Sequence, residues 1–430
     1  MARRLFQIFK PALASEEGDI GFQAARRRSS GSLFRTVLAV LIVLLVVILL
    51  DGLFVRLPSE GPLLPSERIG AVHIHTQASD GSGTVPEVMA AARQANLSFL
   101  AITDHNVAMT AQDIAEDPPD LPIISGEELS TSAGHFLALG LPAGWERPKV
   151  PYDRTLLAAA RAAGAFTVIA HPYHPRTPWT DWKTSDFDGM EIWNEDAVWR
   201  QNNVLDLLIA LLIYPENDQL AMVRLARTPE LNFAKWDELL AQRPVVGMCG
   251  SDVHAKTKLS RTLFIRFPGY VPSFEVAREH VLLGASAGGG ADAARASGAE
   301  ILEALRHGHS FCALDALYPS SGFSTRVSSA GASGGPGDSL FWAGSGRISI
   351  TVPAGASRPL IKVFHDGQEI IEKQAWSVDE VIPGPGRYRV EVFLRQPGLT
   401  GWRRWTLWAF TNPVYVTDPT AASAENFTAR

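Results

Sequence analysis

An uninterrupted apolar run near the N-terminus constrains this chain more than any other feature. Residues 36–50 read TVLAVLIVLLVVILL, and Asp51 is the only charged residue between this run and Arg56. About 20 apolar residues are enough to cross the hydrocarbon core of a bilayer as a helix. A core helix of a globular domain would show a polar face, which this run lacks. We therefore expect residues 36–55 to form a transmembrane helix.

A cleavable signal peptide is the alternative interpretation of this run. Against it, 35 residues precede the run, and the stretch from Asp51 to Arg56 is a poor small-residue cleavage site. Residues 1–35 carry seven Arg or Lys residues and three Asp or Glu residues. Because basic flanks stay in the cytoplasm, we expect 1–35 to be a basic cytoplasmic segment followed by a signal anchor. The remainder would be extracytoplasmic (periplasmic or extracellular), on a single-pass cell-membrane protein that contacts the lipid bilayer through its N-terminal helix.

Composition excludes several classes of protein. The 430 residues are 46% hydrophobic with a net charge of −6, which excludes a disordered chain and gives no reason to expect nucleic acid as a partner. Cys249 and Cys312 are the only cysteines, so a framework of several disulfides or a thiolate zinc cluster is excluded. We expect Cys249 to be a small packing residue of the core.

Residues 66–315 are predicted to form the main domain, because short aliphatic runs alternate there with helical patterns. The predicted strands are 69–75, 99–103, 121–126, 136–140, 166–170, 189–193 and 245–250. The predicted helices are 84–94, which opens with a capping box, 154–163, 203–212, 219–227 and 232–242. Strands interleaved with helices indicate an α/β fold with a parallel sheet, most economically a barrel.

The pattern changes after residue 261. Residues 274–283 and 300–307 are predicted helices separated by a Gly- and Ala-rich insertion. Farther along, apolar and polar residues alternate, and Asp366-Gly367 is a strong hairpin signal. We expect residues 341–418 to form a small C-terminal β-sandwich.

Histidines and carboxylates recur at the polar ends of the predicted strands. His73 and His75 share one face of their strand, because side chains alternate with a period of two. The same edge is predicted to carry Asp104, His105, Glu127, Glu128, His135, His171, Asp252 and His254. Crowding these groups in one barrel mouth is costly unless a cation neutralises them. Imidazole and carboxylate ligands without thiolate favour zinc, manganese or iron.

The segments HIHTQASDG, ITDHN, GEE, AHP and GSDVH, in this order, resemble the motifs of the PHP (polymerase and histidinol phosphatase) superfamily. The resemblance covers roughly residues 69–260. It implies a distorted seven-stranded β/α barrel with up to three metal ions in its mouth, and metal-dependent hydrolysis, since several members are phosphoesterases. The extension that contains LRHGHSF and the C-terminal β region resemble, more loosely, an exported branch of these hydrolases.

The resemblance also implies a role for each matching residue. The implied ligands are His73, His75, Glu128 and Asp252 for a first metal, Glu128, His135 and His171 for a second, and Asp80, His105 and His254 for a third. Asp80 stands where some members have histidine. Asp104 is open to three roles, namely metal ligand, orienting group for His105 or general base. We expect Asp104, Asp252 and His254 to take part in catalysis, and Glu127 and Glu191 to support the site.

Bound metal ions would lower the pKa of water to about 7 and supply a hydroxide. We therefore expect a membrane-anchored metal-dependent hydrolase with two or three divalent ions (Zn, Mn or Fe), foremost a phosphoesterase that uses a metal-bound hydroxide on a small phosphorylated substrate. The last ligand is followed by Lys256, Lys258 and Arg261, which could bind the negative charge of the phosphorylated substrate. Hydrolysis of carboxylic or carbamic esters or of amides is the alternative. A non-catalytic binding protein of the cell envelope is a third hypothesis.

Overall fold

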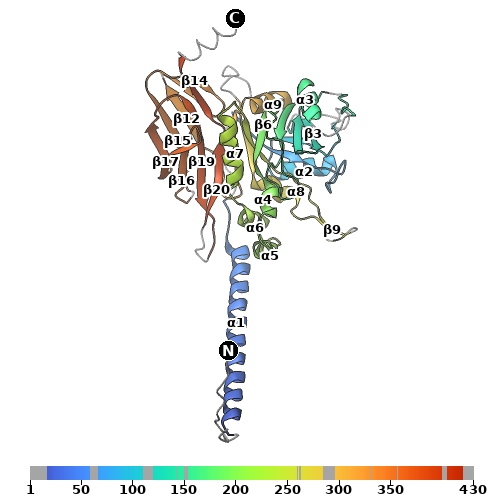
Figure 1. The fold of residues 1–430 in the computed structure, drawn as a ribbon, viewed down its shortest axis with the longest axis vertical. Coiled ribbons are helices and arrows are strands. Elements are labelled where there is room, and N and C mark those ends of the chain that lie inside the picture. Colours follow the sequence, from blue (N-terminus) through green and yellow to red (C-terminus); the bar gives the residue numbers. More distant parts are fainter. Residues whose placement is uncertain are drawn as a thin grey trace, which may run out of the picture.

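A computed structural model gives the arrangement of the chain (Figure 1). It describes residues 17–58, 66–109, 120–142, 144–149, 154–258, 260, 263–283, 296–329, 331–355, 357–399 and 404–419, and the side chains of the first helix from residue 32 onward. That helix, α1 (Glu17–Phe54), projects away from a globular part that contains the other described elements (Figure 1). Within these ranges, its segment Ser32–Phe54 is the one helix long and apolar enough to cross a membrane.

The last turn of α1 is fixed to the globular part. Asp51, the charge that interrupts the apolar run, accepts a hydrogen bond from Nη2 of Arg224 at 2.8 Å and another from the backbone N–H of Leu399 at 2.8 Å. Both the Asp51 and Arg224 side chains are mostly buried, at 10% and 16% exposure, so water screens this pair weakly. Asp51 therefore joins α1 to two segments of the globular part, one containing Arg224 and the other Leu399.

The predicted strands of the main domain are confirmed, although β3 extends five residues beyond its predicted end. They are β1 (Glu67–Ile74), β2 (Phe99–Ile102), β3 (Ile123–Thr131), β4 (Gly134–Leu139), β5 (Phe166–Ile169), β6 (Gly189–Asn194) and β7 (Val246–Gly250). Most of their residues are buried. In the sheet the strands lie side by side in chain order. A parallel bridge between Ile74 and Val253 brings the segment after β7 back to β1.

The expectation of a parallel sheet is wrong for β4. Strand β4 pairs antiparallel with both β3 and β5, whereas β1, β2 and β3 are parallel, as are β5, β6 and β7. Residues 132 and 133 alone connect β3 to β4, and so short a link allows a hairpin but no crossover. Because β4 runs the opposite way, its first residues, including His135, lie at the edge where the parallel strands end.

The predicted helices of the main domain are also confirmed. They are α2 (Val85–Gln94), α3 (Arg154–Ala162), α5 (Val204–Ile213), α6 (Asp218–Leu225) and α7 (Glu230–Leu240), and α4 (Glu195–Arg200) was not predicted. The capping box of α2 is present, because Thr84 and Glu87 each accept from the backbone N–H of the other. Asn194, the last residue of β6, caps α4, so this helix begins directly at the strand end.

The prediction of one helix over residues 274–283 is wrong in its second half. Helix α8 covers Tyr270–Val276, and β10 (Arg278–Leu282) then pairs antiparallel with β1. The backbone N–H and C=O groups along the edge of β1 need hydrogen-bond partners. A strand over residues 278–282 provides them, whereas a helix would not. Helix α9 (Gly298–Arg306) is confirmed. Most of the Gly- and Ala-rich insertion before it, residues 284–295, lies outside the described residues.

The chain's two cysteines form a disulfide, which corrects the expectation that Cys249 only packs in the core. Cys249 lies on β7 and Cys312 on β11 (Ser310–Ala313), 63 residues apart. Closing a loop of this length stabilises a fold by about 4 kcal/mol in the chain-entropy estimate. The disulfide therefore ties the last strand of the main domain to the extension that follows it.

The C-terminal region is built of strands, as predicted, and shares its larger sheet with the main domain. Its strands are β12 (Ser324–Ser329), β13 (Ala332–Gly334), β14 (Ser339–Phe341), β15 (Gly346–Thr351), β16 (Leu360–His365), β17 (Gln368–Gln374), β18 (Ser377–Val381), β19 (Gly386–Arg395), β20 (Trp405–Thr411) and β21 (Val414–Thr417). Strands β13, β12, β15 and β18 form a separate sheet. Strand β20 pairs with β11, which makes the other sheet continuous with β10 and β1. Asp366-Gly367 forms the predicted hairpin between β16 and β17.

Candidate metal centre

A fully buried carboxylate, Glu128 on β3, lies at the centre of the histidines predicted from the sequence. Described imidazole nitrogens surround its two oxygens at 2.8–3.2 Å, those of His73, His75 and His105 near Oε2 and those of His135 and His171 near Oε1. These side chains come from β1, β4 and the segments after β2 and β5. The structure therefore brings together the ends of strands that are far apart in the chain.

Two further carboxylates complete the cluster. Oδ1 of Asp252 lies 3.5 Å from Nε2 of His73 and 3.3 Å from Nε2 of His75. Oδ1 of Asp80 lies 3.1 Å from Nε2 of His254. The Asp80 side chain is 45% exposed, whereas Asp252 is almost fully buried. The cluster thus has a buried side at Asp252 and a solvent-facing side at Asp80.

Several groups of these side chains have the spacing that a metal ion needs. In each group one donor atom per residue lies within 4.8 Å of the others: His75, Asp80, His105 and His254; His73, His75 and Glu128; His73, His171 and Asp252; and His105, Glu128 and His135. The sets share members, as expected for neighbouring ions that share ligands. They contain every residue that the sequence motifs assigned to a metal.

The backbone at these positions is unusual. His73, His171 and Asp252 have φ angles of 66°, 28° and 49°, a region that residues other than glycine rarely adopt. At His73 the pairing of β1 with β2 shifts by one residue. Such conformations cost roughly 1–3 kcal/mol each and persist where the surroundings impose them, typically at functional sites. All three side chains belong to the cluster, and those of His73 and His171 contact Glu128.

Glu191 orients two of the histidines. Its Oε1 lies 2.7 Å from Nδ1 of His73, and its Oε2 accepts the backbone N–H of His171 at 2.6 Å. Because Nδ1 of His73 is engaged in this way, Nε2 is the nitrogen that faces the cluster. A carboxylate behind a metal-binding histidine fixes its tautomer and ring orientation. A Cβ on Gly250 would overlap Glu191, which explains a glycine there.

Asp104 does not point into the cluster. Its Oδ1 accepts the backbone N–H of Thr76 at 2.8 Å and the hydroxyl of Ser79 at 2.5 Å, and its Oδ2 accepts the hydroxyl of Thr76 at 2.6 Å. Both oxygens are therefore occupied in holding the loop that carries Asp80. This geometry favours a positioning role for Asp104 on the 76–80 loop, while its expected roles as metal ligand or general base stay predictions.

Other buried polar side chains lie beside or away from the cluster. Glu127 neighbours Glu128 on β3 but faces the opposite side, and burial, opposed by Arg147, raises its pKa to about 7. His174 accepts from Thr177 in its own loop. His280 lies between Glu67 and Asp315 at the other end of β1. These residues support the fold.

The donor set fits divalent cations. Buried atoms of the cluster that make no hydrogen bond include Nε2 of His73, both ring nitrogens of His75, Nδ1 of His105 and Oε2 of Glu128. Buried polar atoms are ordinarily satisfied, and each exception needs an explanation. Here the atoms face one another as ligand atoms do around a shared cation, and imidazole with carboxylate suits zinc, manganese or iron.

The electrostatics also favour a bound cation. Burial disfavours every charge in the cluster, but the carboxylates outweigh it and raise the pKa of His73, His105 and His171. Burial likewise opposes ionisation of Glu128 and Asp252, yet the imidazoles hold the pKa of both well below the usual range. The site therefore stabilises positive charge among ionised carboxylates, which protons or metal ions can supply.

Replacing Glu191 with glutamine should weaken metal binding without removing a ligand. The amide carries no charge and holds His73 less firmly, and loss of such a supporting carboxylate typically costs 10- to 100-fold in metal affinity. Titration of purified full-length protein with zinc or manganese would measure this. Glu279→Gln is the matched control, because Glu279 is equally buried but accepts from the backbone of Cys249. Unchanged affinity in Glu191→Gln would contradict the assigned role.

Replacing Asp104 with asparagine separates positioning from general-base catalysis. Asparagine keeps one acceptor for the 76–79 loop, so we expect turnover to fall less than about tenfold with an unchanged pH profile. Loss of a general base would cost about 10²- to 10⁴-fold and remove one limb of the profile. The pH dependence of kcat for the two proteins decides between these roles.

Comparisons with known proteins agree with this site. The family model of the PHP domain matches residues 71–162, which include His73, His75, His105, Glu128 and His135. No curated protein matches the chain. His171, Asp252 and His254 lie beyond the matched segment, so their place in the site comes from the structure.

Three solved structures match parts of the chain at low similarity. A two-domain protein from Bacteroides vulgatus that contains a PHP-like metal-dependent phosphoesterase is 13% identical, with 82% of this chain and 99% of that chain covered and a TM-score of 0.42. An amidohydrolase from Chromobacterium violaceum with bound sulfate is 17% identical, with coverage of 43% and 87% and a TM-score of 0.28. A metal-dependent phosphoesterase from Bifidobacterium adolescentis is 19% identical, with coverage of 51% and 96% and a TM-score of 0.27.

Likenesses this distant carry no argument about the reaction. The family match is independent of them, and it covers the motif segments from His73 to His135 around which the histidine and carboxylate cluster is built. The resemblance seen in those motifs is therefore confirmed over residues 71–162, the segment that matches the PHP domain.

Proposed function

We propose that the protein is a membrane-anchored metal-dependent phosphoesterase that acts outside the cytoplasm. The observation that carries this proposal is the cluster around Glu128, where imidazole nitrogens face both oxygens of one buried carboxylate. A carboxylate with ligands on both oxygens is suited to bridge two cations. We further propose that β1–β7, with the bridge from Ile74 to Val253, form the distorted barrel whose mouth is this cluster, and that the C-terminal strands form a sandwich.

The proposed ligand sets follow the contacts around the three carboxylates. Glu128 would bridge two ions, one bound by His73, His75 and Asp252, the other by His135 and His171. Asp80, His105 and His254 would bind a third ion, and Nδ1 of His75 lies 3.9 Å from Asp80 on the same side. When bound, two or three such ions lower the pKa of water to about 7 and neutralise charge on a phosphoryl group.

The chain's own residues would position the substrate and handle protons. Burial lowers the pKa of His254, but Asp80 and Asp252 outweigh it and raise that pKa to about 9. Nδ1 of His254 lies 3.0 Å from the carbonyl of Asp252, which leaves Nε2 directed toward Asp80 and the solvent-facing side. Where the third ion is absent, His254 would hold a proton at Nε2 for a departing alcohol.

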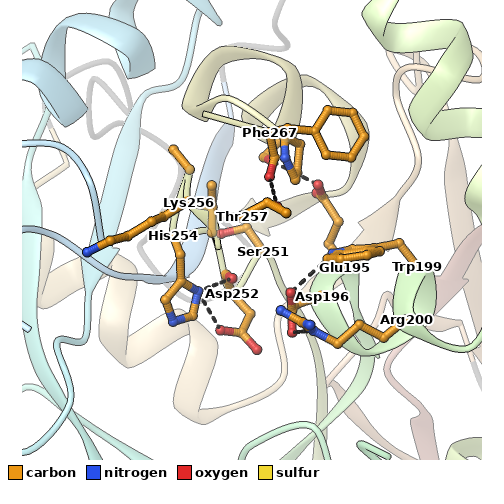
Figure 2. Close-up of a pocket in the computed structure, with 14 residues that line it drawn as sticks. Glu195, Asp196, Trp199, Arg200, Ser251, Asp252, His254, Lys256, Thr257 and Phe267 are labelled. Carbon is orange, nitrogen blue, oxygen red and sulfur yellow. Dashed lines mark hydrogen bonds and ion pairs between the residues drawn. The ribbon is translucent and has the colours of Figure 1, made fainter. Parts of the chain in front are cut away.

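A pocket leads from solvent to this side of the cluster (Figure 2). It is lined by Asp252 and His254 together with Lys256, Arg200, Glu195 and Asp196. Arg200 pairs with Asp196, so Lys256 is the cation that would favour an anionic substrate such as a phosphate ester. Arg261 and the side chain of Lys258, the other cations expected near the last ligand, lie outside the described residues.

Two observations support an extracytoplasmic location. Ser32–Phe54 is long and apolar enough for a membrane helix, and the basic residues lie before it in the sequence. The buried disulfide between Cys249 and Cys312 is of a kind that forms in oxidising compartments and is rare in the cytosol. Together they favour a signal anchor with the metal centre on the outer side.

The class of ester that the protein hydrolyses can be determined with full-length protein in detergent that has been reloaded with manganese or zinc. We expect release of the aryl alcohol from aryl phosphate monoesters or diesters, abolished by chelator and by Asp252→Ala, which removes a proposed ligand carboxylate. Glu279→Gln is the control for a buried acid outside the site. Turnover of aryl carboxylic or carbamic esters without hydrolysis of either phosphate ester would overturn the phosphoesterase proposal and favour the alternative hydrolase.

A further inference from the structure

Both walls of the pocket continue into exposed apolar segments. One wall is α4, and only residues 202 and 203 separate its cap Gln201 from α5. In α5 the exposed fractions lie between 42% and 73% for Val204, Leu205, Leu208, Leu211 and Leu212. The other wall, Lys256 and Thr257, leads into the segment of β8 (Thr257–Lys258) and β9 (Phe264–Ile265). There Leu263, Phe264 and Ile265 are between 39% and 57% exposed. Exposed apolar patches of this kind mark contact surfaces.

These two segments lie on the side of the globular part from which α1 projects. In Figure 1, α5 and β9 are at the lower edge, where α1 joins, and β14 is at the opposite end. Helix α5 also contacts α1 directly, because a Cβ on Gly52 would meet Cγ2 of Ile213 at 3.6 Å. The apolar surface of α1, including exposed Leu53 and Phe54, therefore continues into α5.

The length of α5 indicates how it would meet a membrane. Its ten residues span roughly 15 Å, about half of a bilayer core, so it cannot cross. Its exposed apolar residues recur at spacings of one, three and four, which places them on one face. A short helix with one apolar face beside a membrane anchor is suited to lie in the interface, with that face in the acyl region.

The two apolar segments are held together at the pocket rim. The ring of Tyr214, at the end of α5, lies 4.6 Å from the ring of Phe267, and its hydroxyl accepts the backbone N–H of Gly269 at 2.9 Å. Phe267 lines the pocket (Figure 2). Tyr214 thus links α5 to the segment after β9, and both would contact one surface together.

Each wall also pairs a cation with an aromatic ring. Nζ of Lys256 lies 5.4 Å from the centre of the Phe264 ring, and the guanidinium of Arg200 lies 4.6 Å from that of Trp199. Lys256 and Arg200 stand on opposite sides of the pocket, with Asp252 and His254 between them (Figure 2). Arg200 also donates to Asp196 at 2.5 Å, so the wall of Lys256 and Phe264 is the one that best matches a molecule with an anionic group beside an apolar body.

We propose that α5 and the β8–β9 segment seat in the outer face of the bilayer that α1 crosses, and that the metal centre acts on the phosphate ester of a lipid in that bilayer. This rests on the proposed function and its membrane anchor. The lipid headgroup would enter between Lys256 and Arg200 while its chains stay among the apolar side chains of the rim. Water attacks phosphorus, the P–O bond to the alcohol breaks, and the alcohol takes up a proton.

The seating can be measured without activity. The native cysteines are paired, so Leu208→Cys and Phe264→Cys would each carry a single fluorescent label in full-length protein reconstituted in phosphatidylcholine vesicles. We expect lipid-borne nitroxide to quench both labels and iodide to quench them several-fold less than Phe341→Cys on β14. Equal iodide quenching at all three positions would overturn the membrane contact.

The substrate class is tested in the same vesicles. Dioleoyl phosphatidate is compared with its water-soluble dibutyryl analogue, and dioleoyl phosphatidylglycerol with its dibutyryl analogue, as monoester and diester pairs. We expect kcat/KM to be at least tenfold higher for a long-chain member. Leu208→Asp with Leu211→Asp should lower that value at least tenfold and leave soluble turnover unchanged.

The outcomes separate this inference from the proposed function. Equal turnover of long- and short-chain esters would overturn the lipid substrate and leave the phosphoesterase standing. The absence of chelator-sensitive hydrolysis of every phosphate ester would overturn both claims about the reaction, while the quenching result would still decide whether the domain contacts the bilayer.

Discussion

The attraction between one buried carboxylate, Glu128, and the imidazoles around it is the interaction on which this site depends. Burial alone would neutralise Glu128, yet its neighbours hold it ionised. The same contacts require positive charge close by. An arrangement of this kind is costly in an apolar interior unless protons or metal ions compensate it, so the chemistry of the site is set by its electrostatics.

The fold provides this arrangement through departures from regular structure. Strand β4 reverses direction and delivers His135 to the edge where the parallel strands end. Left-handed backbone occurs at His73, His171 and Asp252, whose side chains belong to the cluster. Glu191, which has room because residue 250 is glycine, holds two of these histidines. Three of the proposed ligand positions are thus strained, as expected where packing elsewhere sustains a functional geometry.

Much of this could be predicted from the sequence, because periodicity and end signals are local. The strands from 69–75 to 245–250 and the Thr84 capping box are local patterns, and the structure has them. The features that local patterns do not predict depend on distant partners. Asp104 follows a strand as a ligand would, but Thr76 and Ser79 occupy its oxygens. The local pattern of residues 278–282 predicts a helix, but pairing with the edge of β1 makes this segment a strand. Nothing local indicates that Cys249 reaches Cys312.

The metal content of the purified full-length protein tests the central claim most directly. Protein prepared in detergent without chelator would be analysed by elemental mass spectrometry beside Glu128→Gln and Glu279→Gln. A cluster built around Glu128 predicts two or three divalent ions per chain in the native protein and in Glu279→Gln, and at most one in Glu128→Gln. A native protein that binds no divalent ion under saturating zinc or manganese, or a Glu128→Gln variant that retains the full number, would contradict it.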